Sequence, residues 1–476
     1  MAVKKAKKEE IKLEYERKNG WTLATDKEKK AIFDFADKYM KFLDAAKTER
    51  EAVKTTVKML EKEGFVDVNT KKSLSAGDKV YFVNKAKSLY AAIIGTESLE
   101  NGINLCGAHI DSPRLDLKPN PLYEDGEIAL FKTHYYGGIR KYQWTTIPLA
   151  LHGVVSLANG KTIDVCVGED EKDPIFIISD LLPHLSAQQN KKPLNEAIAG
   201  EDLNVIVGSI PVPNEKDDKG EEKPAQNAIK KNILNILNKK YGISERDFVS
   251  AELEVVPAFK ARSIGFDEGL IGAYGHDDRV CAFPELMALL DVKKPKKTAV
   301  CLLSDKEEVG SQGNTGMKSM NFELFLGQLL EKLGYNSPYS LQKLLSNSRC
   351  LSADVTAAYD PTFAYVMEKM NAAYLAGGIA FCKYTGARGK SGASDANAEF
   401  IGEVRGIMEA NNVSYQFCEM GKVDEGGGGT IAYILADKGM EVLDCGVPVI
   451  SMHAPYEQIS KYDLYHSYLA YRAFLK

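Results

Sequence analysis

The sequence contains no Cys-x-x-Cys pair, although it has eight cysteines. Structural zinc sites built on thiolates use such closely spaced pairs, so this kind of site is excluded. Most of the cysteines lie inside apolar segments such as AVCLL. We expect them to be reduced and buried in the core.

No apolar run in the sequence approaches the ~18 uncharged residues that a membrane-spanning helix needs. The sequence begins MAVKKAKKEE, which is charged where a secretory signal peptide requires an apolar stretch. We therefore expect no membrane partner and a cytoplasmic location.

A basic surface for nucleic acid is also missing. The 61 basic and 66 acidic residues leave a formal net charge of -5, and the basic residues do not alternate with aromatic residues. A surface that follows phosphates normally combines both features. We expect no nucleic acid partner.

The chain is long for one hydrophobic core. Its 476 residues exceed the ~250 to 300 residues at which a single core stops growing. Its composition, with 44% apolar and 27% charged residues, is that of an ordinary globular protein. Two domains, or one domain with a large insertion, are therefore expected.

The spacing of apolar residues divides the chain into three parts. Helical spacing over residues 27–64 predicts two helices, and short β-branched and aromatic runs follow up to His109. After Pro257, strands alternate with helices, which predicts an α/β fold with a mixed sheet sandwiched by helices. Residues 124–255 consist mainly of strands and turns. We expect a split α/β domain, residues 1–123 and 256–476, around an inserted, mainly β domain, residues 124–255.

Five segments place His, Asp or Glu at or just beyond the end of an apolar run. They are GAHIDSPRLDLKP, GHDDRVCAF, LLSDKEEVGSQG, LSADV and VISMHAPYE. Strand ends are where α/β sheets present chemistry, and the chain has only seven histidines. Together the segments predict a metal cluster, although each one alone is compatible with an ordinary polar group.

In the first segment, His109 and Asp111 lie two residues apart and so point to the same side of an extended strand. A carboxylate in this position can accept the second ring N–H of a metal-bound imidazole, which makes Asp111 an orienting residue. The pair is equally compatible with an ordinary loop.

The adjacent acids Asp277 and Asp278 open an apolar segment that is typical of a helix start. They either favour the helix N-terminus electrostatically or supply one carboxylate that bridges two cations. The residues themselves do not decide between Asp277 and Asp278.

Glu307 and Glu308 follow the apolar run AVCLLS. Two neighbouring carboxylates are costly to desolvate without cations. One of them can bind metal while the other, unligated, takes a proton from the attacking water. The alternative is an exposed acidic turn, which the apolar strand before it makes less favourable.

Asp354 and His453 each end a further apolar run. Each is either a metal ligand or a structural polar residue. Imidazole together with carboxylates is the ligand mixture of zinc, cobalt or manganese, whereas magnesium seldom selects imidazole. We expect divalent metal ions, with zinc first and cobalt or manganese as alternatives.

In their order and approximate spacing, these segments resemble the aspartyl aminopeptidase family of metallopeptidases, which includes the aminopeptidase I type. The resemblance covers nearly the whole chain. It implies a zinc aminopeptidase-like fold with an inserted dimerisation domain, and the release of N-terminal amino acids from short peptides. It also implies two metal ions per subunit: His109, Asp277 and Asp354 would hold one, Asp277, Glu308 and His453 would hold the other, and Glu307 would be the general base.

The segment LLPHLSAQQ is similar to the family's Pro-His-Leu segment, which implies that His184 reaches the active site of a neighbouring subunit. The resemblance further implies a homo-oligomer, a hollow tetrahedral dodecamer that admits peptides rather than folded proteins. Two other functions stay open. One is a related two-metal hydrolase, such as a glutamyl aminopeptidase-like enzyme or a deacylase, and the other is a non-catalytic cage or scaffold.

Near the expected substrate pocket the sequence departs from the eukaryotic aspartyl enzymes, with KSGASDANAEF and MGKVDEGGGGTIA. Acidic and neutral N-terminal residues are therefore equal alternatives as substrates. Lys390 is a candidate partner for an acidic side chain, or else a solvated loop residue. The glycine run that includes Gly428 lets the backbone approach a substrate, or forms a mobile loop.

Overall fold

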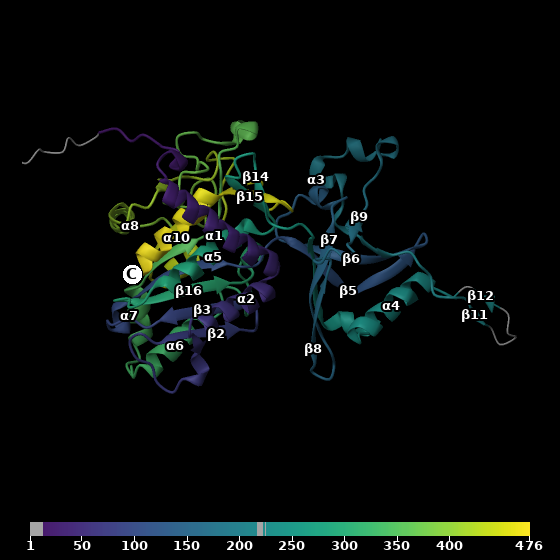
Figure 1. Cartoon of the computed structure of the whole chain (residues 1–476), viewed down its shortest axis with the longest axis horizontal. Coiled ribbons are helices and arrows are strands. Elements are labelled where there is room, and N and C mark those ends of the chain that lie inside the picture. Colours follow the sequence, from purple (N-terminus) through teal and green to yellow (C-terminus); the bar gives the residue numbers. More distant parts are fainter. Residues whose placement is uncertain (1–12, 217–221, 224) are drawn as a thin grey trace, which may run out of the picture.

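A computed structural model describes residues 13–216, 222–223 and 225–476 of the chain. Figure 1 shows two lobes: a sheet covered by helices, and a mainly β lobe that carries α4 (Ala228–Tyr241). Both the N-terminal helices and the C-terminal helix lie in the first lobe. The chain therefore leaves the first lobe after its N-terminal part, forms the second lobe and then returns to the first.

A nine-stranded sheet forms the centre of the first lobe. Four central strands run parallel and their neighbours add antiparallel pairs, so the sheet is mixed. In spatial order the strands are β1 (Val66–Asp67), β2 (Lys79–Asn84), β3 (Ser88–Ile93), β16 (Thr298–Ser304), β4 (Ile103–His109), β17 (Arg349–Ala353), β21 (Glu441–Gly446), β19 (Ile379–Cys382) and β20 (Tyr415–Phe417). The strands β3, β4 and β16 are buried along their whole length, which explains their nearly continuous apolar sequences.

Helices cover both faces of this sheet. One face carries α1 (Asp26–Ala45), α2 (Glu49–Lys62), α5 (His276–Asp291), α8 (Ala398–Ala410) and α10 (Lys461–Leu475), and the other carries α6 (Asn321–Lys332), α7 (Ser340–Ser346) and α9 (Ala432–Ala436). The expected α/β fold and the two predicted N-terminal helices are confirmed. Within the described ranges, no helix is both long enough and apolar enough to cross a membrane.

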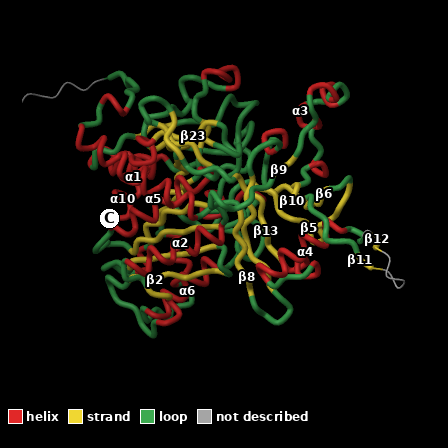
Figure 2. Tube along the Cα trace, turned by 45° about the vertical axis from the view of Figure 1, so that its right-hand side comes forward, coloured by secondary structure: helices red, strands yellow, loops and turns green. Residues whose placement is uncertain are grey.

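An antiparallel seven-stranded sheet forms the second lobe, with α4 packed against it (Figures 1 and 2). In spatial order the strands are β8 (Thr162–Val167), β7 (Leu149–Ser156), β13 (Ala251–Pro257), β5 (Arg114–Asp125), β6 (Ile128–Tyr136), β10 (Val205–Gly208) and β9 (Ile177–Ile178). The short helix α3 (Leu194–Ala197) lies between β9 and β10, and the pair β11 (Glu215–Lys216) and β12 (Glu222–Lys223) follows β10.

The strand β5 begins upstream of residue 124, where the sequence pattern puts the start of the insertion. Pro119 and Pro121 obscure this strand, because proline is rare inside regular sheets. The ladder between β5 and β6 shifts its register between Leu117 and Leu122, around the two prolines. The seven-stranded sheet therefore starts directly after the HIDSP segment that contains His109.

A third sheet, of five strands, links the start of α5 to the C-terminal part of the chain. Its strands are β14 (Arg262–Ile264), β15 (Leu270–Ala273), β23 (Glu457–Ser460), β22 (Pro448–Ile450) and β18 (Thr356–Ala357). The strand β15 ends just before α5, and the turn between β22 and β23 contains His453. Because β15 pairs with β23, the start of α5 lies next to this turn.

Buried charges join α2 to the seven-stranded sheet. The imidazole of His152 lies between two carboxylates, with Nδ1 2.7 Å from Glu51 Oε1 and Nε2 3.0 Å from Glu169 Oε1. Lys47 Nζ also donates to Glu169 Oε1, at 2.6 Å. Burial alone lowers the pKa of His152, but its hydrogen bonds with neighbours that include both carboxylates outweigh burial and raise the pKa to about 11. The protonated imidazole thus stabilises the contact between the lobes.

We expect His152→Gln to destabilise the protein in a pH-dependent way. Folding raises the pKa of His152 from ~6.5 in the unfolded chain to about 11. The protonated imidazole therefore contributes stability that is fully present below pH ~6.5 and is lost as the pH rises towards 11. The loss should be about 1–3 kcal/mol at pH 6. Thermal unfolding midpoints of wild type and variant at pH 6, 8 and 10 should converge as pH rises, and the exposed His134→Gln should serve as the neutral control. A constant difference would contradict this account.

Candidate metal centre

Three neighbouring parallel strands end at one edge of the nine-stranded sheet. The strand β4 ends at His109, β17 ends just before Asp354, and β16 leads into a 3₁₀ turn that contains Glu307 and Glu308. Because the carboxyl ends of parallel strands meet at the same edge, these side chains converge although they are far apart in the sequence.

Two further residues reach the same point from other elements. Asp277 lies in the first turn of α5 but has non-helical backbone angles (φ -78°, ψ 108°). His453 lies in the turn between β22 and β23 with a positive φ of 65°. The five-stranded sheet holds both segments side by side.

The structure assembles the predicted ligands into two groups that share Asp277. One group consists of His109, Asp277 and Asp354, the other of Asp277, Glu308 and His453, with the candidate ligand atoms of each group within 4.8 Å of one another. His109 Nε2 lies 3.1 Å from Asp277 Oδ1, and His453 Nε2 lies 3.1 Å from Asp277 Oδ2. The carboxylate of Asp277 thus presents one oxygen to each imidazole.

The residues of both groups fit divalent cations. Of the candidate ligand atoms, Asp277 Oδ1 and Glu308 Oε1 are buried oxygens without a hydrogen-bond partner. Asp277 Oδ1 lies close to His109 Nε2, but the two atoms are not aligned for a hydrogen bond. This arrangement is typical of two ligand atoms that face the same cation position. Buried carboxylates without partners are costly, and a cation offsets this cost. The mixture of imidazole and carboxylate suits zinc.

Asp111 holds both the first imidazole and the acidic turn. His109 Nδ1 lies 3.0 Å from the carbonyl oxygen of Asp111 and 3.2 Å from its Oδ1. The carboxylate also accepts the backbone N–H of Glu307 at 3.1 Å and that of Glu308 at 3.2 Å. These contacts direct the Nε2 atom of His109 towards the shared point and hold the two glutamates in register.

Glu307 belongs to neither group. Its Oε2 lies 4.0 Å from His109 Nε2, and its side chain keeps 18% of its exposure. Burial, with a smaller contribution from the charge of Asp354, raises the pKa of Glu307 to about 8. Glu307 is thus an acidic side chain that lies beside the two candidate ligand groups and is not itself a member of either.

Asp278 is not a member of either group, although it neighbours Asp277 in the sequence. Its side chain is fully buried and belongs to neither candidate ligand set. Burial raises the pKa of Asp278 well above its usual range. The geometry therefore groups Asp277, rather than Asp278, with the other ligands.

Sequence reasoning missed Glu457, which positions two of the candidate ligands. Its side chain, in β23, is 1% exposed and accepts the backbone N–H of Asp277 at 3.1 Å and that of His453 at 2.7 Å. Ser112 adds a hydrogen bond from its hydroxyl to the carbonyl oxygen of Asp277, at 2.6 Å. The only sequence signal for Glu457 is its place four residues after His453.

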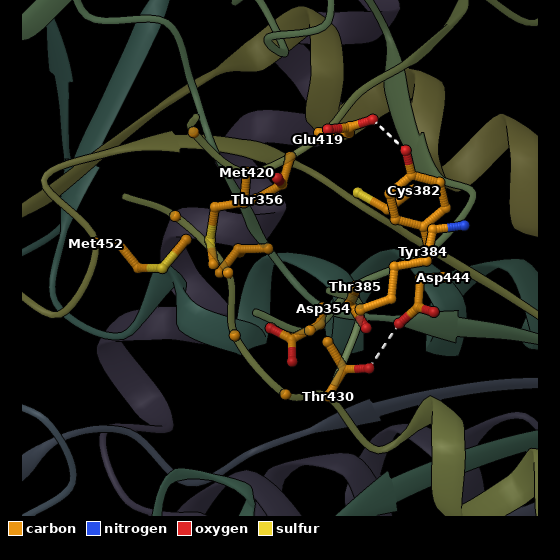
Figure 3. A pocket seen from close by; sticks show the side chains of 18 of the residues that line it. Asp354, Thr356, Cys382, Tyr384, Thr385, Glu419, Met420, Thr430, Asp444 and Met452 are labelled. Atoms are coloured by element: carbon orange, nitrogen blue, oxygen red, sulfur yellow. Dashed lines mark hydrogen bonds between the residues drawn. The ribbon is translucent and has the colours of Figure 1, made fainter. Parts of the chain in front are cut away.

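A cavity of about 710 Å³ adjoins the two groups (Figure 3). The candidate ligands Asp277, Glu308, Asp354 and His453 line it together with Glu307, Tyr384, Lys390, Glu419, Gly428 and Asp444. Asp444 accepts a hydrogen bond from Thr430, and Glu419 accepts one from Tyr384 (Figure 3). Lys390 is already engaged, because its Nζ lies 2.9 Å from Asp395 and 3.8 Å from the centre of the Tyr384 ring.

The remaining predicted residue, His184, lies away from this cavity within one chain. It is exposed, in a 3₁₀ turn of the second lobe (Pro183–Leu185), and is not among the residues that line the cavity.

Comparison with known proteins decides the family. A family model described as Aminopeptidase I zinc metalloprotease (M18) matches residues 42–475. The chain belongs to the M18 aminopeptidase family. It is 52% identical over 464 residues to a probable M18 family aminopeptidase 1 of Clostridium acetobutylicum. The alignment covers 97% of this chain and 98% of the relative. The expected family and its enzyme class, a zinc metalloaminopeptidase, are confirmed.

Solved M18 structures share the fold. An M18 aminopeptidase from Thermotoga maritima is 45% identical, with a TM-score of 0.92 over 97% of this chain and 100% of the other. The mApe1 dodecamer from S. cerevisiae is 21% identical, with a TM-score of 0.74 over 93% of this chain and 96% of the other. The first likeness confirms the zinc aminopeptidase-like fold, and the second shows the fold alone.

We expect Asp277→Asn to weaken zinc at both groups, because it removes the carboxylate charge that they share. After zinc refilling and gel filtration, elemental analysis should find less than about half of the wild-type zinc per subunit in this variant. The matched variant Asp278→Asn should keep the wild-type zinc content. The reverse pattern, with zinc kept by Asp277→Asn and lost by Asp278→Asn, would assign the bridging role to Asp278.

Proposed function

We propose that the protein removes N-terminal residues from short peptides with two divalent cations per subunit. The observation that carries this proposal is the carboxylate of Asp277, which offers one oxygen to each imidazole while Glu307 stays unligated beside them. When bound, two such cations polarise a scissile carbonyl and make an attacking water more acidic. Zinc is the metal we propose, with cobalt or manganese as alternatives for the same ligands.

Glu307 is the proposed general base. It lines the cavity and lies outside both ligand groups, so its carboxylate can take a proton from the attacking water and deliver it to the leaving amine. Asp111 supports this role, because it holds the backbone N–H groups of Glu307 and Glu308.

The cavity beside the ligand groups would take the N-terminal side chain. Two acidic residues, Asp444 and Glu419, line it, and Asp444 is only 3% exposed. The candidate cation Lys390 also lines the cavity, but its side chain is 44% exposed and paired with Asp395, so it is a weak partner for an acidic substrate. Arg388 and Lys422 line the cavity as well, so the cavity carries charges of both signs, and acidic and neutral N-terminal residues stay equal alternatives as substrates.

Glu307→Gln should abolish turnover without loss of metal, because the amide keeps the shape but cannot accept the proton. We expect kcat to fall at least about 100-fold on an aminoacyl-p-nitroanilide, with an unchanged zinc content. An activity near that of the wild type would refute the assignment.

Blocked peptides separate the alternative functions. An aminopeptidase should cleave a peptide with an amidated C-terminus and should not cleave the same peptide with an acetylated N-terminus. Cleavage of only the N-acetylated peptide would indicate a deacylase or another two-metal hydrolase. A wild-type protein that cleaves no peptide and binds less than about one zinc ion per subunit would favour a non-catalytic cage or scaffold.

We also propose a homo-oligomer, of the dodecameric kind described for the yeast protein. The second lobe exposes a group of large apolar side chains around His184, with exposed fractions of 50% for Leu181, 49% for Leu182 and 67% for Leu185. Exposed apolar patches of this kind mark protein interfaces. In such an assembly this segment would pack on a neighbouring subunit and bring His184 to its cavity. The cytoplasmic location stays a prediction from the sequence.

His184→Ala and Leu185→Asp should separate assembly from catalysis. We expect His184→Ala to lower kcat about 10-fold or more while native mass spectrometry finds the wild-type assembly. Leu185→Asp should dissociate the assembly and lower activity together, because a buried unpaired charge opposes packing. A monomeric wild type, or a fully active dissociated Leu185→Asp, would contradict the proposal.

A further inference from the structure

The end of β6 reaches from the second lobe to the candidate metal centre. Three consecutive residues, Tyr136, Gly137 and Gly138, each lie next to a different residue of the centre. The strand β5 of the same sheet begins at Arg114, directly after the segment that contains His109 and Asp111. The segment Tyr136–Gly138 adds a second contact of this sheet with the site, from residues distant in the sequence.

Tyr136 acts on the first ligand group through Asp111. Its hydroxyl donates to Asp111 Oδ2 at 2.8 Å, and the same oxygen accepts the backbone N–H of Glu308. The other carboxylate oxygen, Asp111 Oδ1, lies 3.2 Å from His109 Nδ1. The hydroxyl thus fixes the orientation of a carboxylate that sets both the imidazole and the acidic turn.

Gly138 and Gly137 act on the second ligand group. The carbonyl oxygen of Gly138 accepts a hydrogen bond from His453 Nδ1 at 2.8 Å, which leaves Nε2 to face Asp277. Gly137 has a φ of +73°, and a Cβ atom there would lie 3.2 Å from Glu308 Oε2 and 3.3 Å from Glu308 Cβ. A side chain at this position would require Glu308 to move by a few tenths of an ångström, and the positive φ would be strained for any other residue.

Ion pairs hold this segment in place. The guanidinium of Arg114 lies 4.0 Å from the centre of the Tyr136 ring, and it pairs with Glu49 of α2 at 3.2 Å and with Glu254 of β13 at 3.3 Å. Arg114 and both glutamates are buried. The position of Tyr136 is thus tied to the first lobe and to the seven-stranded sheet at once.

We propose that Tyr136 is a positioning residue for the metal centre and that the segment Tyr136–Gly138 makes metal binding depend on the seven-stranded sheet. The inference rests on the two-metal function proposed above. Residues that orient metal ligands typically change metal affinity by about 10- to 100-fold when they are removed. A residue that only supported the fold would change stability and leave the affinity of the folded protein unchanged.

Tyr136→Phe tests this role, with Tyr135→Phe as the matched control. The neighbouring Tyr135 is 43% exposed and makes no contact with the site. We expect Tyr136→Phe to weaken zinc about 10- to 100-fold in a chelator competition assay, while the thermal unfolding midpoint of the zinc-free protein stays that of wild type. In the zinc-saturated enzyme kcat should fall and KM should stay unchanged. Zinc affinity and kcat equal to those of Tyr135→Phe would overturn the proposal.

Gly137→Ala is a second, independent test, with Gly126→Ala as its control. Gly126, in the turn between β5 and β6, also has a positive φ (+56°), but a Cβ atom there would meet nothing within 4 Å. We expect Gly137→Ala to bind about one zinc ion per subunit where Gly126→Ala binds the wild-type number, because only the former displaces Glu308. Equal zinc binding by Gly137→Ala and Gly126→Ala would overturn the proposal. This test does not depend on whether Tyr136→Phe folds.

The wild-type protein separates this inference from the proposed function. If the wild type binds two zinc ions and releases N-terminal residues while the variants behave like their controls, the positioning role is wrong and the function stands. If the wild type binds no zinc and cleaves no aminoacyl substrate, the proposed function itself fails.

Discussion

The burial of several carboxylates at one point is the constraint on which the rest of this structure depends. Asp277, Glu307, Glu308 and Asp354 lie within a few ångströms of two imidazoles, largely out of contact with water. Like charges at such distances destabilise a fold unless cations or hydrogen-bond donors offset them. The ligand groups provide room for cations on one side, and backbone N–H groups reach Asp111 and Glu457 on the other.

Several local departures from regular geometry follow from this convergence. The first turn of α5 has non-helical angles at Asp277 and Asp278, and Lys306 and His453 have positive φ values of 66° and 65°. Such conformations are costly for residues with side chains and persist where the surrounding structure holds them. At Asp277 and His453 the carboxylate of Glu457 supplies part of that support, because it accepts both backbone N–H groups.

The second lobe contacts both the candidate metal centre and the helices of the first lobe. It starts directly after the HIDSP segment, its strand β6 ends at the candidate metal centre, and ion pairs of Arg114 and His152 connect it to α2. The M18 relatives align over nearly the whole chain, the second lobe included. This lobe therefore combines an exposed apolar surface with direct contacts to residues of the candidate metal centre.

The sequence by itself determined the fold class and the candidate ligands, because apolar periodicity reports burial and each ligand stands where an apolar strand ends. The family resemblance added the pairing of those ligands around Asp277. Only the tertiary structure showed which carboxylate oxygens face which imidazole and that Asp277, not Asp278, belongs to both candidate ligand groups. It alone also showed the supporting roles of Glu457 and Tyr136. These roles depend on contacts between residues far apart in the chain, such as Tyr136 with Asp111 across two sheets, and periodicity carries no information about such contacts.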